Sequence, residues 1–185
     1  MDGPRLPPFD RRFLESDQIA SAIGEGEVGG KAAGLLRASD LLAGAPLDLP
    51  DRISVRIPRV VVLTTDAFRA FVAANDLADC WRGDPLDSHL ANAFLRAELP
   101  PSIVGDLRTL IEGERRPLAV RSSSLLEDRA HRPFAGVYAT KMIPNSDPDP
   151  ARRFQALTEA IKLVWASTFF REARAYRETV SLEEE

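Results

Sequence analysis

The sequence predicts an α/β (α+β) domain in which a small mixed or antiparallel sheet is flanked by helices. Two observations lead to this fold class. Arg59–Leu63 and Leu118–Val120 are short, continuous apolar runs bounded by proline or by polar residues, as buried strands are. Several longer segments carry apolar residues three and four positions apart, which is the spacing of amphipathic helices.

The helices and the hairpin can be placed from local signals. A second strand over Gly136–Ile143 is expected to return beside Leu118–Val120, with the hairpin tip in the loop Asp128–Pro133. Ala43–Pro50 reads as a loop. Helices are expected at Gly29–Leu42, Asp66–Asn75, Leu86–Leu95, Ser102–Glu112, Pro150–Ser167 and Phe170–Thr179.

Composition excludes several classes of function. The chain has 185 residues with 44% hydrophobic and 28% charged residues, enough for one ordinary core, and its net charge of -4 offers no general attraction to nucleic acid. No apolar run approaches the roughly 20 residues that cross a bilayer. Cys80, the single cysteine, allows no intrachain disulfide. We expect a cytoplasmic protein that binds neither nucleic acid nor membrane.

The domain organisation is expected to be simple. Residues 1–12 are rich in proline and charge and read as an extended lead-in, and residues 13–180 read as one lobe. Residues 181–185 follow an amphipathic segment without a closing turn, so they are interpreted as a tail or a truncation point.

Two known glycine-rich nucleotide-binding motifs do not fit this sequence. Gly24 to Gly29 match G-x-G-x-x-G, but the preceding residues 16–23 read as helix or loop instead of the buried strand that a dinucleotide site requires. A Walker loop is excluded because the spacing to Lys31 is wrong and Ala32 offers no hydroxyl for magnesium.

Gly29-Gly30-Lys31 remains as a candidate anion site at a helix start. Backbone N–H groups, the positive end of the helix dipole and one ammonium group converge there, and phosphate is the natural ligand. The alternative is a glycine turn that carries a solvated lysine.

Arg121 strengthens the phosphate hypothesis. It ends an apolar strand and is followed by three serines, so its guanidinium fork stands beside the hydroxyl and backbone donors of Ser122 and its neighbours. The alternative is a structural ion pair with Glu127 or Asp128. The later Phe134-Ala135-Gly136 allows close approach of backbone to a ligand, although an ordinary hairpin turn has the same composition.

Catalytic and metal-binding residues are not assigned. His89 and His131 lack an orienting carboxylate and a nucleophile and are interpreted as surface residues, and Cys80 lacks an activating neighbour. The large aromatic residues are expected to be core residues instead of a base-stacking platform: Phe68, Phe71, Trp81, Phe154, Trp165, Phe169 and Phe170.

Four ordered blocks resemble the N-terminal ATP-binding domain of phosphoenolpyruvate synthase, pyruvate phosphate dikinase and their rifampicin-phosphotransferase relatives. The blocks are VGGKAAGLL, IPRVVVLTTDAFRAF, LAVRSSSLLEDRAHRPFAGVYAT and IKLVWASTFFREARAYR. The resemblance implies the first lobe of an ATP-grasp fold. It also implies that Lys31 and Arg121 contact ATP phosphates, while Gly136 and Thr140 belong to the hairpin that covers them.

The chain departs from the family pattern at several positions, and the run Ser124-Leu125-Leu126, which is more apolar than usual, points to a divergent branch. Val137 and Tyr138 stand where many members have glutamines, and Val60 stands where glycine is common. Residues 137 and 138 are therefore not assigned the polar contacts that glutamines would make, and Val60 is expected to change packing.

The resemblance also implies partners that this sequence does not contain. A second ATP-grasp lobe would hold Mg2+, and a phosphohistidine domain would carry phosphate from ATP to pyruvate or a related acceptor. This chain alone is therefore expected to be inactive. The alternative is a non-catalytic module for nucleotide sensing or interaction that is derived from the same fold.

Overall fold

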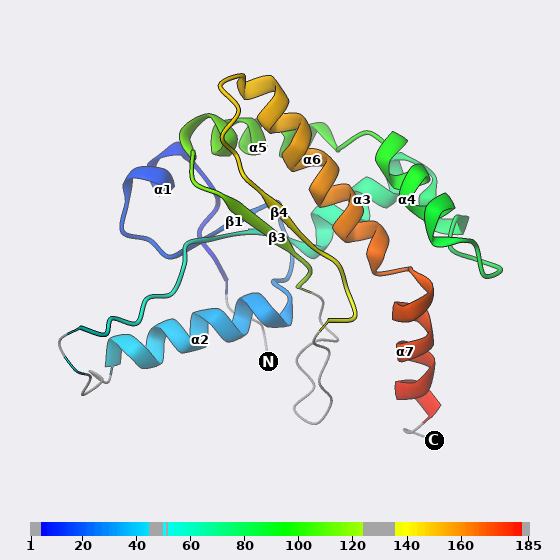
Figure 1. The fold of residues 1–185 in the computed structure, drawn as a ribbon, viewed down its shortest axis with the longest axis horizontal. Coiled ribbons are helices and arrows are strands. Elements are labelled where there is room, and N and C mark those ends of the chain that lie inside the picture. Colours follow the sequence, from blue (N-terminus) through cyan, green and yellow to red (C-terminus); the bar gives the residue numbers. More distant parts are fainter. Residues whose placement is uncertain (1–4, 45–49, 51, 124–135, 183–185) are drawn as a thin grey trace.

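A computed structural model describes residues 5–44, 50, 52–123 and 136–182, and Figure 1 shows their arrangement. Small sheets are flanked by helices, as predicted. In chain order the elements are α1 (Arg11–Glu15), β1 (Ala20–Ile23), α2 (Gly30–Gly44), β2 (Val60–Leu63), α3 (Thr65–Ala74), η1 (Leu77–Asp79), α4 (Asp87–Arg96), α5 (Pro101–Gly113), β3 (Leu118–Arg121), β4 (Thr140–Ile143), α6 (Pro150–Ser167) and α7 (Arg171–Leu182).

β1 and β2 form a parallel pair that α2 connects. Ala20 of β1 lies opposite Val60 of β2, and a further parallel bridge joins Pro8 to Ala22. Every residue of β1 is buried, as parallel strands covered on both faces usually are. The sheet therefore includes part of the N-terminal segment.

The prediction that residues 16–23 form a helix or loop is wrong, because Ala20–Ile23 are a strand. Three of the four side chains, those of Ala20, Ser21 and Ala22, are small and have little intrinsic preference for a strand. Pairing with β2 and with the N-terminal segment stabilises them instead, and the buried Ser21 hydroxyl donates to the Pro7 carbonyl at 3.1 Å. Strand formation in such a segment depends on tertiary context.

β3 and β4 form an antiparallel pair in which Leu118 lies opposite Ile143 and Arg121 lies opposite Thr140. The predicted second strand, Gly136–Ile143, is shorter than expected because its first four residues do not join the ladder. Gly136 has φ +87°, and Tyr138 is buried against α7, so this stretch turns away from β3. The hairpin tip at residues 128–133 lies outside the described residues.

The predicted helices all form, and Pro150–Ser167 has the predicted bounds. The helix expected over Gly29–Leu42 runs from Gly30 to Gly44, so it includes the start of the stretch that was predicted to be a loop. The short α1 and η1 were not predicted. Asp10 caps α1 by accepting from the backbone N–H of Arg12 at 2.8 Å.

The two largest clusters of buried side chains join helices to the sheets and to one another. The first joins α1, β1, α5, β4 and α6 through residues such as Phe13, Ile23 and Ile161. The second is aromatic, and its rings include Trp81 stacked on Phe169 with centroids 4.0 Å apart. The prediction that the large aromatic residues belong to the core is confirmed. α6 contributes to both clusters.

Candidate functional site

The glycine loop, residues 24–29, joins β1 to α2. Hydrogen bonds with Thr64 and Thr65, at the start of α3, fix its backbone. The Thr64 hydroxyl donates to the Glu25 carbonyl. The Thr65 N–H donates to the Glu27 carbonyl at 3.2 Å, and the Glu27 N–H donates to the Thr65 hydroxyl at 3.3 Å. These contacts give the loop one defined path across the carboxyl ends of the parallel strands.

Packing explains two glycines of this loop. Gly24 and Gly26 have φ +92° and +100°, a conformation that residues with side chains rarely adopt. A Cβ on Gly24 would lie 2.7 Å from the Thr64 hydroxyl, and one on Gly26 would lie 2.7 Å from the Asp66 carboxylate. The G-x-G pattern therefore serves contact with α3. Sequence reasoning missed this role, although two threonines between a strand and a helix were a visible signal.

A buried strand, β1, directly precedes the glycine loop, so the prediction that no such strand stands before the G-x-G-x-x-G motif is wrong. A dinucleotide site also needs an acidic residue at the end of the second strand. β2 ends at Leu63 and is followed by Thr64, so that residue is missing, as predicted. Gly24 and Gly26 are also accounted for by their contacts with Thr64 and Asp66.

The first turn of α2 is the most buried part of that helix. Gly30, Ala32 and Ala33 are buried, and Lys31 is half-buried between them. The Ala33 N–H donates to the Gly29 carbonyl at 3.1 Å, while the Ala32 N–H donates to the Ser123 hydroxyl at 3.0 Å. The positive end of the helix dipole lies at this turn, which also carries Lys31.

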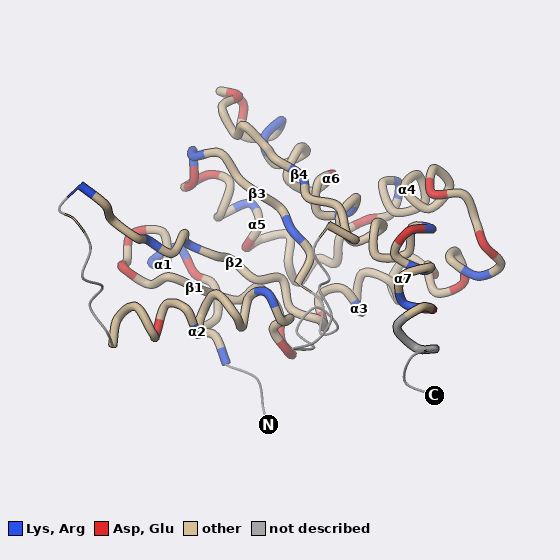
Figure 2. Tube along the Cα trace, turned by 60° about the horizontal axis from the view of Figure 1, so that its bottom comes forward, with Lys and Arg blue, Asp and Glu red and all other residues tan. Residues whose placement is uncertain are grey.

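The segment that follows β3 lies directly against the start of α2. The Ser123 carbonyl is so close to Gly29 that any Cβ on Gly29 would overlap it. Ser123 and Ala32 are 91 residues apart in the sequence. Figure 2 shows the end of β3 and the start of α2 in the same part of the molecule. The fold thus brings the segment of Gly29-Gly30-Lys31 close to the segment of Arg121 and Ser122.

The hairpin presents Arg121 and Thr140 together. They are directly opposite in the antiparallel ladder, and both are exposed. Cross-strand neighbours point to the same face with their Cβ atoms about 4.5–5.5 Å apart. Ser122 is half-buried and Gly136 is exposed. The alternative partners of Arg121, Glu127 and Asp128, lie outside the described residues, as do Phe134 and Ala135.

Tyr138 accounts for one departure from the family pattern. Its ring is buried against Ala173 and Tyr176 of α7, and its hydroxyl accepts from the Arg177 guanidinium at 3.5 Å. The neighbouring Ala139 N–H donates to the Ser167 hydroxyl at 3.0 Å. Tyr138 therefore anchors the start of the hairpin's second arm to the corner between α6 and α7.

Val60 accounts for another departure. It is half-buried and packs with Val28, Ala32 and Val62 under the first turn of α2. The larger side chain fills space beneath the helix start, which confirms that this position contributes packing.

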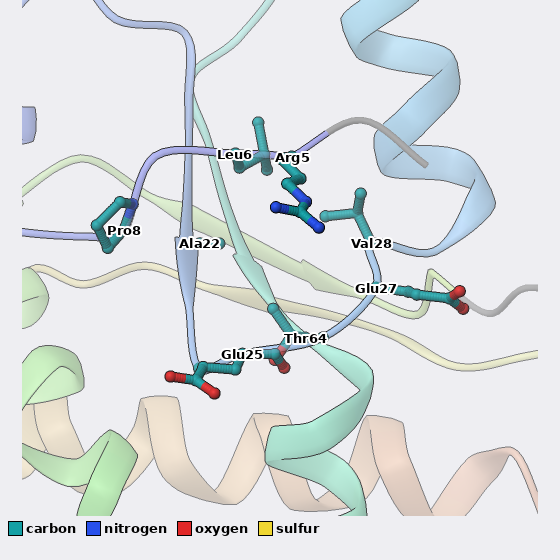
Figure 3. A pocket seen from close by; sticks show the side chains of 10 residues that line it. Arg5, Leu6, Pro8, Ala22, Glu25, Glu27, Val28 and Thr64 are labelled. Carbon is teal, nitrogen blue, oxygen red and sulfur yellow. The ribbon is translucent and has the colours of Figure 1, made fainter. Parts of the chain in front are cut away.

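A hollow of about 540 Å³ lies between the glycine loop and the N-terminal segment (Figure 3). Arg5 and Leu6 of the N-terminal segment form one wall, and Glu25 and Thr64 stand across from them. Lys31 and Arg121 do not line it. The side chains of Glu25 and Glu27 point in different directions in Figure 3, so they do not converge on one point.

Other candidate groups remain without a site in the described residues. His89 is exposed, as predicted, and His131 lies outside those residues. Burial raises the pKa of the half-buried Cys80 thiol, which disfavours its reactive thiolate. No group of three or more His, Cys, Asp or Glu residues in the described part of the chain is arranged to hold a metal ion.

None of the described helices is long and apolar enough to cross a membrane.

Comparison with known proteins decides the family. The model of the pyruvate phosphate dikinase AMP/ATP-binding domain matches residues 25–185. The chain belongs to this family. It is an ATP-grasp-type nucleotide-binding lobe, and the match begins within the glycine loop and includes both arms of the β3–β4 hairpin. The resemblance inferred from the four sequence blocks is confirmed.

The phosphoenolpyruvate synthase of Aeropyrum pernix is similar to this chain. The two are 29% identical over an alignment of 179 residues. The match covers 85% of this chain and 20% of that protein. The AMP/ATP-binding domain described above therefore spans about a fifth of the length of this relative. No solved structure matches the chain significantly.

Proposed function

We propose that Lys31 and Arg121 bind the phosphates of ATP in one half of the nucleotide site of a dikinase-type phosphotransferase. The observation that carries this proposal is the contact of Ser123 with Gly29 and Ala32, which joins the start of α2 to the end of β3. Family membership supports nucleotide as the ligand.

The two cations suit different tasks. Lys31 is a compact positive charge at a helix N-terminus, where the dipole already favours an anion. Arg121 carries a planar fork of donors that can hold two phosphate oxygens at once. We assign supporting contacts to Gly29, Gly30 and Ser122. Thr140 and Gly136 are assigned to the hairpin that covers the phosphates.

The full reaction needs groups beyond these residues. We propose that a second ATP-grasp lobe holds Mg2+, which neutralises phosphate charge when it is bound. A phosphohistidine domain would then accept the phosphoryl group and pass it to pyruvate or a related acceptor. In this proposal residues 13–180 act as the first lobe, 1–12 as a lead-in, and the protein works in the cytoplasm.

The proposal is tested by measuring ATP affinity of the full-length protein by titration calorimetry. We expect Lys31→Ala and Arg121→Ala each to weaken binding roughly 10- to 100-fold, because each removes hydrogen bonds to a charged group. Arg37→Ala is the matched control, since Arg37 is an exposed cation farther along α2. Unchanged affinity in both site variants would show that the assignment is wrong. Tight binding without phosphoryl transfer would favour the nucleotide-sensing alternative.

A further inference from the structure

We propose that Ser123 is a positioning residue of this site. Its hydroxyl accepts from the Ala32 N–H, and its backbone lies against Gly29. We infer that these contacts hold the segment after β3 on the first turn of α2 and so keep Arg121 close to Lys31. This inference rests on the proposed function, because it concerns how the two phosphate-binding cations are kept together.

Ser123 supplies a helix cap that the local sequence of α2 lacks. The first N–H groups of a helix have no partner within it, and usually a serine, threonine, aspartate or asparagine just before the helix accepts from one of them. Here that position is Gly29, which has no side chain. The Ser123 hydroxyl instead accepts from the Ala32 N–H at 3.0 Å, although it belongs to a segment 91 residues later.

Gly29 completes the contact by leaving room for the Ser123 backbone. A Cβ at Gly29 would overlap the Ser123 carbonyl and would also lie 2.7 Å from its hydroxyl. The absence of a side chain at Gly29 thus explains both features. It leaves α2 without a local cap, and it lets the capping segment approach closely enough to replace that cap.

Apolar packing contributes little to the position of α2 beyond its first turn. The buried residues of α2 are confined to its first turn, and they are glycine and alanine. Ala32 packs with Val28 and Val62, which holds the turn against β2. On its other side this turn contacts Ser123, two residues beyond the end of β3.

Lys31 and Arg121 are close in sequence to the two residues that form this contact, Ala32 and Ser123. Lys31 immediately precedes Ala32, and Arg121 is two residues before Ser123. Two residues span at most about 7 Å even when fully extended. Fixing Ser123 on Ala32 therefore confines the Arg121 backbone to a small region near Lys31. A ligand that needs both cations then meets them already assembled, which lowers the ordering cost of binding.

The experiment measures ATP affinity of the full-length protein with Ser123→Ala and Ser123→Thr. We expect Ser123→Ala to weaken binding roughly 10-fold, because Arg121 is no longer held in place, and Ser123→Thr to stay near the wild-type value because it keeps the hydroxyl. Ser39→Ala, on the same helix but away from β3, is the matched control and should bind normally. If Ser123→Ala does not fold, Ser123→Cys takes its place with the same expected loss.

The decisive measurement is the loss of ATP affinity that Arg121→Ala causes, first in the wild-type protein and then in a protein that already carries a substitution at Ser123. If Ser123 positions Arg121, Arg121→Ala weakens ATP binding roughly 10-fold or more in the wild-type protein, but by less than about 3-fold in a protein that already carries Ser123→Ala or Ser123→Cys. A merely structural role would lower Tm and leave the Arg121 effect unchanged, which overturns the proposal.

The two proposals fail in different ways. Normal ATP affinity in Ser123→Ala, with weakened binding in Lys31→Ala and Arg121→Ala, removes the positioning role and leaves the phosphate contacts standing. Normal affinity in Lys31→Ala and Arg121→Ala overturns the proposed function, and the role of Ser123 falls with it.

Discussion

α2 and α6 are held in the molecule by different means. α6 has buried residues along its whole length, from Arg153 to Ser167, and packs against α4, α5 and the second sheet. The buried residues of α2 are Gly30, Ala32 and Ala33, all in its first turn, and Leu41 near its other end is 73% exposed. Figure 1 shows α2 along one edge of the molecule, while α6 runs from the top of the view down to α7 beside the β3–β4 pair.

This difference separates the scaffold from the proposed site. Burial of apolar surface contributes roughly 25 cal/mol per Å², so a helix with an apolar stripe on the core is held along all of its turns. The buried contacts of α2 lie at its first turn: Ala32 packs with Val28 and Val62, its N–H donates to the Ser123 hydroxyl, and Gly29 lies close to the Ser123 backbone. Substitutions in α6 should therefore change stability most, and substitutions at the start of α2 should change ligand binding as well.

The largest effect is expected in α6. Ile161 is 3% exposed, and Ile161→Ala should lower the free energy of unfolding by about 2–5 kcal/mol, through lost burial and a cavity. Urea denaturation followed by circular dichroism measures this. Ile53→Ala removes the same atoms from a side chain that is 52% exposed, and should cost much less. Equal losses in both variants would contradict the assignment of α6 to the core.

A smaller loss of stability, combined with weaker ATP binding, is expected for Gly29→Ala. The added Cβ overlaps the Ser123 carbonyl, and backbone cannot move aside as easily as a side chain, so about 1–3 kcal/mol of stability should be lost.

Gly34→Ala is the matched control for that change. Gly34 lies on the same helix with no described atom within 4 Å of an added Cβ, so the substitution should raise stability by up to about 1 kcal/mol through helix propensity. Thermal unfolding and ATP titration of the two variants separate the cases. The close contact would be disproved if Gly29→Ala behaved like Gly34→Ala.

The smallest effect is expected toward the end of α2. Leu41→Ala should change the free energy of unfolding by no more than about 0.5 kcal/mol, because this side chain is largely exposed. Leu157→Ala, from the buried stripe of α6, is the comparison and should cost several times more. A large loss from Leu41→Ala would mean that α2 is packed along its length, and the contrast between the two helices would disappear.

The phosphate-binding hypothesis depended on local sequence patterns, which can be recognised without knowing the tertiary structure. Gly30-Lys31 at a helix start and Arg121 at a strand end are local features, and the structure has both where they were expected. α6 was predicted with its observed bounds, because its apolar stripe and the proline at its start act within one segment.

The features that were missed depend on partners distant in sequence. Ala20–Ile23 form a strand because β2 and Pro8 pair with them. The strand predicted to begin at Gly136 begins at Thr140, because Tyr138 turns toward α7. Neither cause is visible in the segment itself.

The sequence by itself determined the helices, the hairpin strand that ends at Arg121, and the family to which the domain belongs, because periodicity and ordered motifs are properties of the chain. Only the tertiary structure decided that Ser123 caps α2 and that the Gly29 and Arg121 segments meet. The hydrogen bond between Ala32 and Ser123, 91 residues apart, and the close contact of Gly29 with the Ser123 backbone depend on how the two sheets and their helices pack, and no local pattern records that packing.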